Sequence, residues 1–436
     1  MARISIQTVI FFPVKNMITK TTAKLQRLES SFLLAIVLGI ALHLAVADAQ
    51  TASARLAPTS VTHVDSFYPL GNSDKLLFSF YSLEEPQLSE AHKHGVSATG
   101  PYYGKKGLIG GVEHAQAAQL PLLYTTGPKV DFESATPATV SAALALLKSE
   151  VASASQRPEI GAWALATEEL RHWRPGEMQW LEQATRIIHE GDPLNRPVFM
   201  YEPNHRDAEA LVKTSRYLDF VAKGTYANYA RMKDSRTWVR WSVEQAVEAA
   251  SKTGKIPVAV LWMARDQETA QDIAAIRSWT RHDVYLSLIT GAKGIIVWSG
   301  FNKRSGFKRD FKDFYEGYLS AAYELNVNPG LGKVFLRGRA VAGISAVVTQ
   351  GPSSQTYKYQ KKSYTYPTVS TKELRLDGRT YLFVVNSANA PCKVRLDGLP
   401  NGSSILNAFT NEAATLSNNE LSMTAYDVQA LTWRDP

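Results

Sequence analysis

Residues 160–201 read IGAWALATEELRHWRPGEMQWLEQATRIIHEGDPLNRPVFMY and show the repeating unit of the fold. The apolar run Ile160–Thr167 predicts a buried strand. Apolar residues recur at helical spacing over Pro175–His189, and Pro197–Tyr201 predicts the next strand. A strand, a helix and a second strand in this order indicate a βα unit of a parallel sheet.

The same alternation extends from about residue 75 to residue 325. The other expected strands are Leu76–Tyr81, Gly95–Thr99, Pro121–Thr125, Phe220–Thr225, Pro257–Trp262 and Gly294–Ser299, and the other clear helices are Ala138–Ala152, Ala208–Tyr217, Thr237–Lys252, Thr269–Thr290 and Phe311–Leu325. Eight such units over about 255 residues are typical of a closed (β/α)8 TIM barrel. A doubly wound open sheet is the alternative, but no Gly-x-Gly-x-x-Gly turn follows the first strand.

The pattern changes after Asn328-Pro329-Gly330 to short strands without a long helix. Asp377-Gly378 separates two strand-like runs and predicts a hairpin, and Asn401-Gly402 marks a further turn. We therefore expect a barrel over residues 75–330 and a small all-β sandwich over residues 331–436, preceded by a lead-in over residues 50–74.

The N-terminal 49 residues have the features of a secretory signal peptide. The apolar run Phe32–Val46 follows several basic residues and ends in the small-x-small pattern Ala47-Asp48-Ala49. The run is shorter than the roughly 20 residues that a transmembrane helix needs, so we expect cleavage rather than stable membrane insertion, with a retained anchor as the alternative. The single cysteine, Cys392, excludes an intrachain disulfide. A secreted or periplasmic protein is the expectation.

Several classes of function lack their local motifs. There is no His-Glu-x-x-His, no paired-cysteine spacing, no Walker loop and no Gly-x-Ser-x-Gly elbow, so we expect neither a metal nor another cofactor. The chain carries a formal charge of +8, but nucleic acid is not an expected partner. The basic and aromatic stretch Tyr357–Tyr366 is better explained as a β loop or a glycan contact than as a surface for bases.

Two carboxylate positions stand at predicted strand ends, where the active sites of barrels lie. Glu168-Glu169 follows the fourth strand, and Glu202 ends the fifth. Adjacent strands lie about 4.8 Å apart, so such carboxylates would face each other across a sugar, one as general acid and one as nucleophile or base. We expect Glu169 to be the acid and Glu202 its partner. The alternatives are that Glu168 or Glu169 begins a helix or pairs with nearby arginines, and that Glu202 belongs to an ordinary strand exit.

These residues resemble the large group of secreted barrel glycoside hydrolases in which an acid/base glutamate closes strand four, typically as Asn-Glu-Pro or Asp-Glu-Pro. Glu168-Glu169-Leu170 occupies those three places, the segment Leu286–Phe301 is similar to their passage into strand eight, and Tyr381–Asn386 is similar to their accessory β-sandwich. The resemblance implies an O-glycosyl hydrolase of polysaccharides or oligosaccharides. Strand seven departs from it, because Val260-Leu261-Trp262-Met263-Ala264 lacks the family's nucleophile, which leaves Glu202 or Asp266 as the second carboxylate.

Aromatic and basic residues gather on the same predicted loops. The aromatic candidates for stacking on sugar rings are Tyr102, Tyr103, Trp173, Tyr226, Trp262 and Trp298, although aromatic residues within strands are often core. His205 and Arg206 are further candidate contacts within a basic rim formed by Lys105, Lys106, Lys129, Arg171, Arg174, Arg231, Lys233, Arg265, Lys303, Arg304, Lys308 and Arg309. Such a rim would attract an acidic glycan, unless neighbouring acidic side chains balance it.

Three functional hypotheses follow. The first is a glycosidase that uses Glu169 with Glu202. The second is a non-catalytic barrel that binds glycan, which the strand-seven end favours. The third is a polysaccharide lyase in which Tyr226 or His205 is the base and arginines neutralise a uronate.

Overall fold

The computed structural model describes residues 74–83, 86–102, 107–227, 236–263, 269–299, 309–359, 361–400 and 404–435. The predicted signal segment, Tyr103, Asp266 and the Asn401-Gly402 turn lie outside these ranges. Among the helices within them, none is both long enough and apolar enough to cross a membrane.

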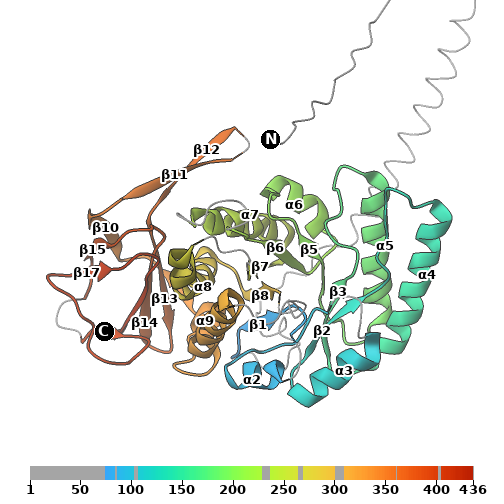
Figure 1. Ribbon diagram of the computed structural model, residues 1–436, viewed down its shortest axis with the longest axis horizontal. Helices are drawn as coiled ribbons and strands as arrows, with labels where there is room; N and C mark the ends of the chain where they lie inside the picture. The colour runs from blue at the N-terminus through green and yellow to red at the C-terminus, as the bar shows by residue number, and fades with distance from the viewer. Residues whose placement is uncertain are drawn as a thin grey trace, which may run out of the picture. The chain divides into compact units, whose positions relative to one another are not determined.

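The first part of the described chain is a closed parallel barrel (Figure 1). Its strands are β1 (Leu77–Phe80), β2 (Leu122–Thr126), β3 (Ile160–Leu165), β4 (Val198–Phe199), β5 (Tyr201–Glu202), β6 (Phe220–Gly224), β7 (Ile256–Trp262) and β8 (Gly294–Trp298). β4 and β5 form one strand position interrupted at Met200, and a short segment that bridges Thr99 to Leu122 lies between β1 and β2. Because β8 pairs with β1, for example Leu77 with Gly294, the ring closes.

Helices cover the outside of the barrel, as expected for βα units. They are α2 (Gln87–Lys93), α3 (Gly107–Ala118), α4 (Pro137–Ala154), α5 (Pro175–Gly191), α6 (Ala208–Ser215), α7 (Thr237–Thr253), α8 (Ala270–Thr290) and α9 (Arg309–Asn326), and α10 (Gly332–Arg337) follows. The predicted helix ends agree with these bounds to within about two residues.

Side chains alternate strictly between the two faces of each barrel strand. Residues such as Leu123, Ala162, Ala164 and Phe199 fill the barrel interior. Their chain neighbours, such as Trp163, pack outward against the helices.

The C-terminal part is an antiparallel β-sandwich. Its strands are β9 (Arg339–Val341), β10 (Ser345–Gln350), β11 (Ser354–Tyr359), β12 (Lys362–Pro367), β13 (Val369–Leu376), β14 (Arg379–Asn386), β15 (Cys392–Asp397), β16 (Leu406–Asn407), β17 (Glu420–Met423) and β18 (Val428–Arg434). A sheet ordered β16-β18-β14-β13-β9 faces one ordered β10-β15-β17 across a shared apolar core. The predicted hairpin at Asp377-Gly378 is confirmed, and both residues have the positive φ angles, 51° and 69°, that a two-residue turn of this kind requires.

Strand β14, inside the larger sheet, is buried on both faces over residues 382–386, which explains its continuous apolar run. Leu382 and Val384 point into the sandwich, whereas Phe383 faces the barrel. There its ring lies 4.4 Å from Phe335 of α10 and 6.2 Å from Tyr285 of α8, between ring centres. The two parts therefore share one core.

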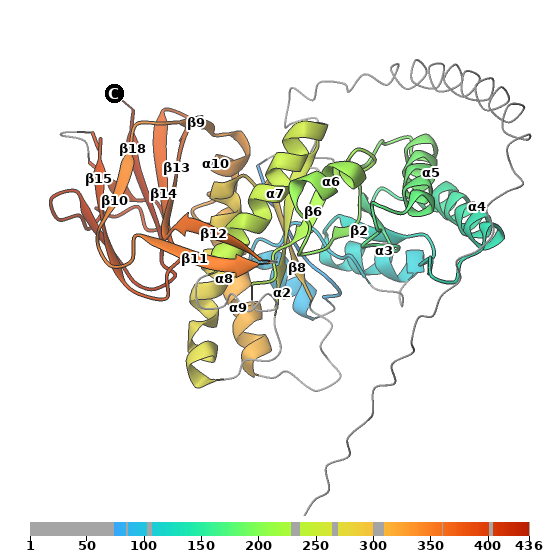
Figure 2. The ribbon, with the colours of Figure 1, turned by 90° about the horizontal axis from the view of Figure 1, so that it is seen from above.

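The hairpin β11–β12 extends from the sandwich and lies along α7 (Figure 2). Its tyrosines lie on one face because of the two-residue period of a strand, and the Tyr359 ring lies 4.6 Å from that of Trp238. The expected β loop at residues 357–366 is thus a hairpin that packs on the barrel.

Candidate functional site

An aromatic cluster lies at the C-terminal ends of the barrel strands, the end we call the mouth. Tyr201, Tyr226, Trp262 and Trp298 come from or follow β5, β6, β7 and β8 and border the barrel interior. Tyr226 lies at its centre, with its ring 5.7 Å from Tyr201, 5.5 Å from Trp262 and 6.1 Å from Trp298. Tyr226 and the two tryptophans are half-buried, so part of this surface is open to a ligand.

Gly224 makes the space that the Tyr201 ring occupies. A Cβ atom added at Gly224 would lie 2.5 Å from the Tyr201 hydroxyl oxygen. The position therefore requires glycine because of close approach. Tyr201 was not among the predicted site residues, although its inward position in the strand was a signal for it.

Glu168 and Glu169 stand beside this cluster, on the loop that follows β3. The Glu169 amide donates a hydrogen bond to the Tyr201 carbonyl at 3.3 Å, and Glu169 has a left-handed φ of 60°. Burial raises the pKa of the Tyr201 hydroxyl, and the charges of Glu169 and Glu168 raise it further, whereas a hydrogen bond with Tyr226 lowers it. Both carboxylates are therefore close enough to the Tyr201 hydroxyl at the mouth to affect its pKa. The Glu169 side chain is exposed, and that of Glu168 is half-buried.

Arg206 fixes the glutamate loop to the exit of β5. One of its terminal nitrogens donates to the carbonyl of Glu169 at 3.1 Å and to that of Leu170. Its other terminal nitrogen pairs with the Glu202 carboxylate. Because the side chain is only 3% exposed, the predicted role of Arg206 as a direct sugar contact is corrected to that of a structural tie.

Glu202 faces away from the mouth. Its neighbour Tyr201 points into the barrel, so Glu202 points to the helix layer, where it meets Arg206 and Thr214 of α6. The side chain is fully buried, which raises the pKa of its carboxyl, and Arg206 opposes that rise. The structure does not bring Glu202 and Glu169 together across a common space, and the expected pairing is corrected for this reason.

Behind the mouth, Lys223 and Asn204 form a buried polar support. The Lys223 ammonium donates to the Asn204 carbonyl at 2.7 Å and lies 4.9 Å from the centre of the Trp241 ring. Burial holds its pKa well below the ordinary value for lysine. The Asn204 side-chain oxygen accepts from the Trp238 indole at 2.6 Å and from the Tyr226 amide at 3.1 Å. Trp238 also packs against hairpin β11–β12, so the hairpin is connected through Trp238 to the same asparagine that holds the Tyr226 amide.

The remaining predicted contacts fall into different environments. Trp173 is 63% exposed on the glutamate loop, with its ring 4.9 Å from that of His172. His205 is exposed on one side, and the protein atoms around the rest of the ring, together with the charges of Arg206 and Lys223, lower the pKa of its imidazole. Tyr102 is buried and donates to the Leu83 carbonyl at 2.7 Å, so it belongs to the core rather than to a sugar platform.

The described arginines of the predicted basic rim are neutralised. Arg171 pairs with Glu133 and with Glu177, and Arg174 lies 3.2 Å from Glu133. Lys129 is exposed, and the other rim lysines and arginines lie outside the described residues or have side chains that are not described. For the described part of the rim, the balanced surface is the better explanation.

The end of β7 carries an aromatic side chain where a retaining barrel glycosidase has its nucleophile. Trp262 is the last residue of β7, and the loop with Asp266 lies outside the described ranges. Within those ranges, no group of three or more His, Cys, Asp or Glu side chains is placed to hold a metal ion. The described mouth thus offers two carboxylates and an aromatic surface, a set that can bind a sugar and donate a proton.

Comparison with known proteins gives the fold. No model of a known family and no curated protein matches the sequence. Among solved structures, an Anoxybacillus α-amylase is similar at a TM-score of 0.50 and 9% identity, over 84% of this chain and 98% of that one. An α-amylase from Geobacillus thermoleovorans complexed with acarbose (TM-score 0.48, 10% identity, 83% and 99% covered) and a GH30 endoxylanase from Clostridium papyrosolvens (0.46, 11%, 84% and 98%) are also similar. At these identities the likeness shows a TIM barrel with a C-terminal β domain and nothing about the reaction.

Proposed function

We propose that this protein is an exported glycoside hydrolase that binds a polysaccharide or oligosaccharide at the barrel mouth. The observation that carries the proposal is the half-buried aromatic surface of Tyr226, Trp262 and Trp298 beside the two glutamates that follow β3. Flat aromatic faces stack on the apolar faces of sugar rings, and a neighbouring carboxylic acid can protonate the leaving oxygen.

In this proposal Glu169 is the general acid, and Glu168 lies next to it on the loop that follows β3. Protonation of the glycosidic oxygen by the Glu169 carboxyl group lets the bond to the sugar break. Asp266, which follows β7 in the sequence, is the proposed second carboxylate in place of Glu202.

A non-catalytic glycan-binding barrel is the second candidate, and the Trp262 side chain at the end of β7 favours it. An aromatic ring there adds binding surface but supplies no nucleophile. A lyase has less support, because Arg206 is already committed to Glu202 and to two backbone carbonyls. Export remains a proposal from the N-terminal pattern, and N-terminal sequencing of the secreted or periplasmic protein tests it.

The test is release of reducing ends from a panel of neutral and anionic polysaccharides. Glu169→Gln should lower the rate by about 10²–10⁴-fold, the usual contribution of a general acid. Glu182→Gln, on the exposed surface of α5, is the matched control and should keep full activity. Binding without release by the unaltered protein would favour the non-catalytic barrel, and product absorbing in the ultraviolet would favour the lyase.

A further inference from the structure

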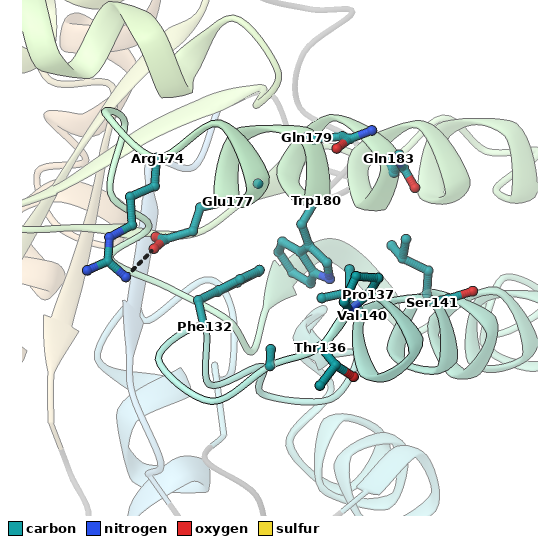
Figure 3. Close-up of a pocket in the computed structure, with 13 residues that line it drawn as sticks. Phe132, Thr136, Pro137, Val140, Ser141, Arg174, Glu177, Gln179, Trp180 and Gln183 are labelled. Atoms are coloured by element: carbon teal, nitrogen blue, oxygen red, sulfur yellow. Dashed lines mark ion pairs between the residues drawn. The ribbon is translucent and has the colours of Figure 1, made fainter.

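A cleft of about 490 Å³ lies outside the barrel, between the first turns of α4 and α5 (Figure 3). Pockets of about 300–1,000 Å³ are the usual size for small ligands. Phe132 and Trp180 form its aromatic part, with ring centres 6.1 Å apart and planes at 76°. Val140 and Leu144 of α4 extend the apolar surface.

The indole of Trp180 carries a polar group without a protein partner. The residue is 2% exposed, and its Nε1–H makes no hydrogen bond within the described structure. Figure 3 shows the indole between the two helices, with its nitrogen turned toward Pro137 and Val140. A buried donor left unpaired costs free energy, and the buried indole forms the base of the cleft beneath the more exposed side chains that line it.

Polar but uncharged groups line both walls. Gln179 and Gln183 are four residues apart and so lie on one face of α5, opposite Thr136 and Ser141 at the start of α4. Amides and hydroxyls supply both donors and acceptors. An apolar floor between such walls matches a ligand with a hydrophobic ring face and hydroxyls around its edge.

The charges at the edge of the cleft cancel each other. Glu177 is 3% exposed and pairs with Arg171 at 2.6 Å, and Arg174 lies 3.7 Å from the same carboxylate. An ionic ligand therefore meets no uncompensated charge from these side chains. A neutral ligand is the better match.

The cleft also shares a loop with the mouth. The segment that carries Glu168 and Glu169 continues through the exposed Trp173 to Arg174, which lines the cleft. The glutamate loop therefore borders both the mouth and the cleft.

We propose that the α4–α5 cleft is a second, separate glycan-binding site, which takes a neutral sugar unit of the same class of glycan that we propose binds at the mouth. The identity of the ligand as a glycan rests on the proposed function, whereas the cleft itself does not. The site holds the sugar by apolar contact with the partly exposed Phe132, Val140 and Leu144 and by hydrogen bonds to the glutamines.

The test is calorimetric titration of the full chain, carrying Glu169→Gln to prevent turnover, with maltohexaose, cellohexaose and xylohexaose. Gln183→Trp fills the cleft, and the double substitution Gln179→Ala, Gln183→Ala removes its amides. Trp298→Ala perturbs the mouth, and Glu182→Gln is the control on the exposed face of α5. Circular dichroism verifies that each variant is folded.

We expect one hexasaccharide to bind with two resolvable affinities. Each cleft variant should weaken one of them at least tenfold and leave the other within twofold, and Trp298→Ala should do the reverse. If the cleft variants titrate like the control while Trp298→Ala loses binding, the cleft proposal fails and the proposed function stands. Loss only in the cleft variants contradicts the mouth assignment and supports the cleft, and absence of binding by all three probes overturns both.

Discussion

Arg206→Met tests the arrangement that holds the glutamate loop at the mouth. The substitution keeps an unbranched apolar side chain, shorter than that of arginine, but removes the cationic partner of the fully buried Glu202 carboxylate. It also removes the donors to the carbonyls of Glu169 and Leu170. Both effects lower the free energy of unfolding.

The expected loss is about 3–5 kcal/mol, the usual cost of removing one member of a buried ion pair. It should depend on pH, because Glu202 already has a pKa raised above 4.5 by burial and loses its stabilising cation in the variant. Consider pH values between the pKa of Glu202 in the parent and its higher pKa in the variant. There Glu202 of the folded variant retains a proton that the unfolded chain has released. Its stability therefore falls by about 1.4 kcal/mol per pH unit as pH rises through that window.

The assay is urea unfolding at pH 5, 6, 7 and 8, with Arg186→Met on the exposed face of α5 as control. Adding Glu202→Gln to Arg206→Met removes the unpaired charge, so the double variant should be more stable than the single one at pH 8. A deficit that is constant with pH and is not relieved by Glu202→Gln would refute this reasoning and reduce Arg206 to a packing residue.

Three further outcomes follow from single positions. Gly224→Ala places a methyl group 2.5 Å from the Tyr201 hydroxyl oxygen, so it should lower the free energy of unfolding in urea by about 1–3 kcal/mol and weaken glycan binding. Binding at parental affinity would contradict the described mouth. Burial lowers the pKa of His282 below its ordinary value of 6.5, so the unfolded chain binds a proton more readily than the folded one, and the free energy of unfolding should fall as pH drops below 6.5. His282→Gln should make the free energy of unfolding less dependent on pH in this range, and an unchanged dependence would exclude His282 as its source. Burial raises the pKa of the Cys392 thiol to about 11, so a thiol reagent at pH 8 should label the unfolded chain at least tenfold faster than the folded one. Equal labelling rates would show that the thiol is accessible in the folded protein.

The architecture followed from local patterns. Runs such as Ile160–Leu165 and the helical spacing in α5 are visible within a dozen residues, because burial of one face imposes its period on the sequence. The Asp377-Gly378 hairpin was predictable for a similar reason, since few residues adopt the positive φ angles of its turn. The positions of Glu168 and Glu169 at a strand end also followed from the sequence.

Tertiary structure decided which side chains meet. Tyr201 and Glu202 are adjacent in sequence, but the pleat of the strand sends the tyrosine to the mouth and the glutamate to α6. Sequence reasoning placed Glu202 at the correct strand end and on the wrong side of it. Arg206 was read as a ligand contact because its loop lies at the mouth, whereas its guanidinium is used inside the protein.

The α4–α5 cleft likewise has no signature in the sequence, because its walls come from segments about 40 residues apart whose separation depends on how the helices pack. The barrel, the sandwich and the loop of the two glutamates could be predicted from the sequence alone. They depend on strands and helices, whose buried faces place apolar residues at periods of two and 3.6 residues. The partners of each buried charge and the shape of each pocket were decided by the tertiary structure, because they arise from contacts between residues that no local pattern relates.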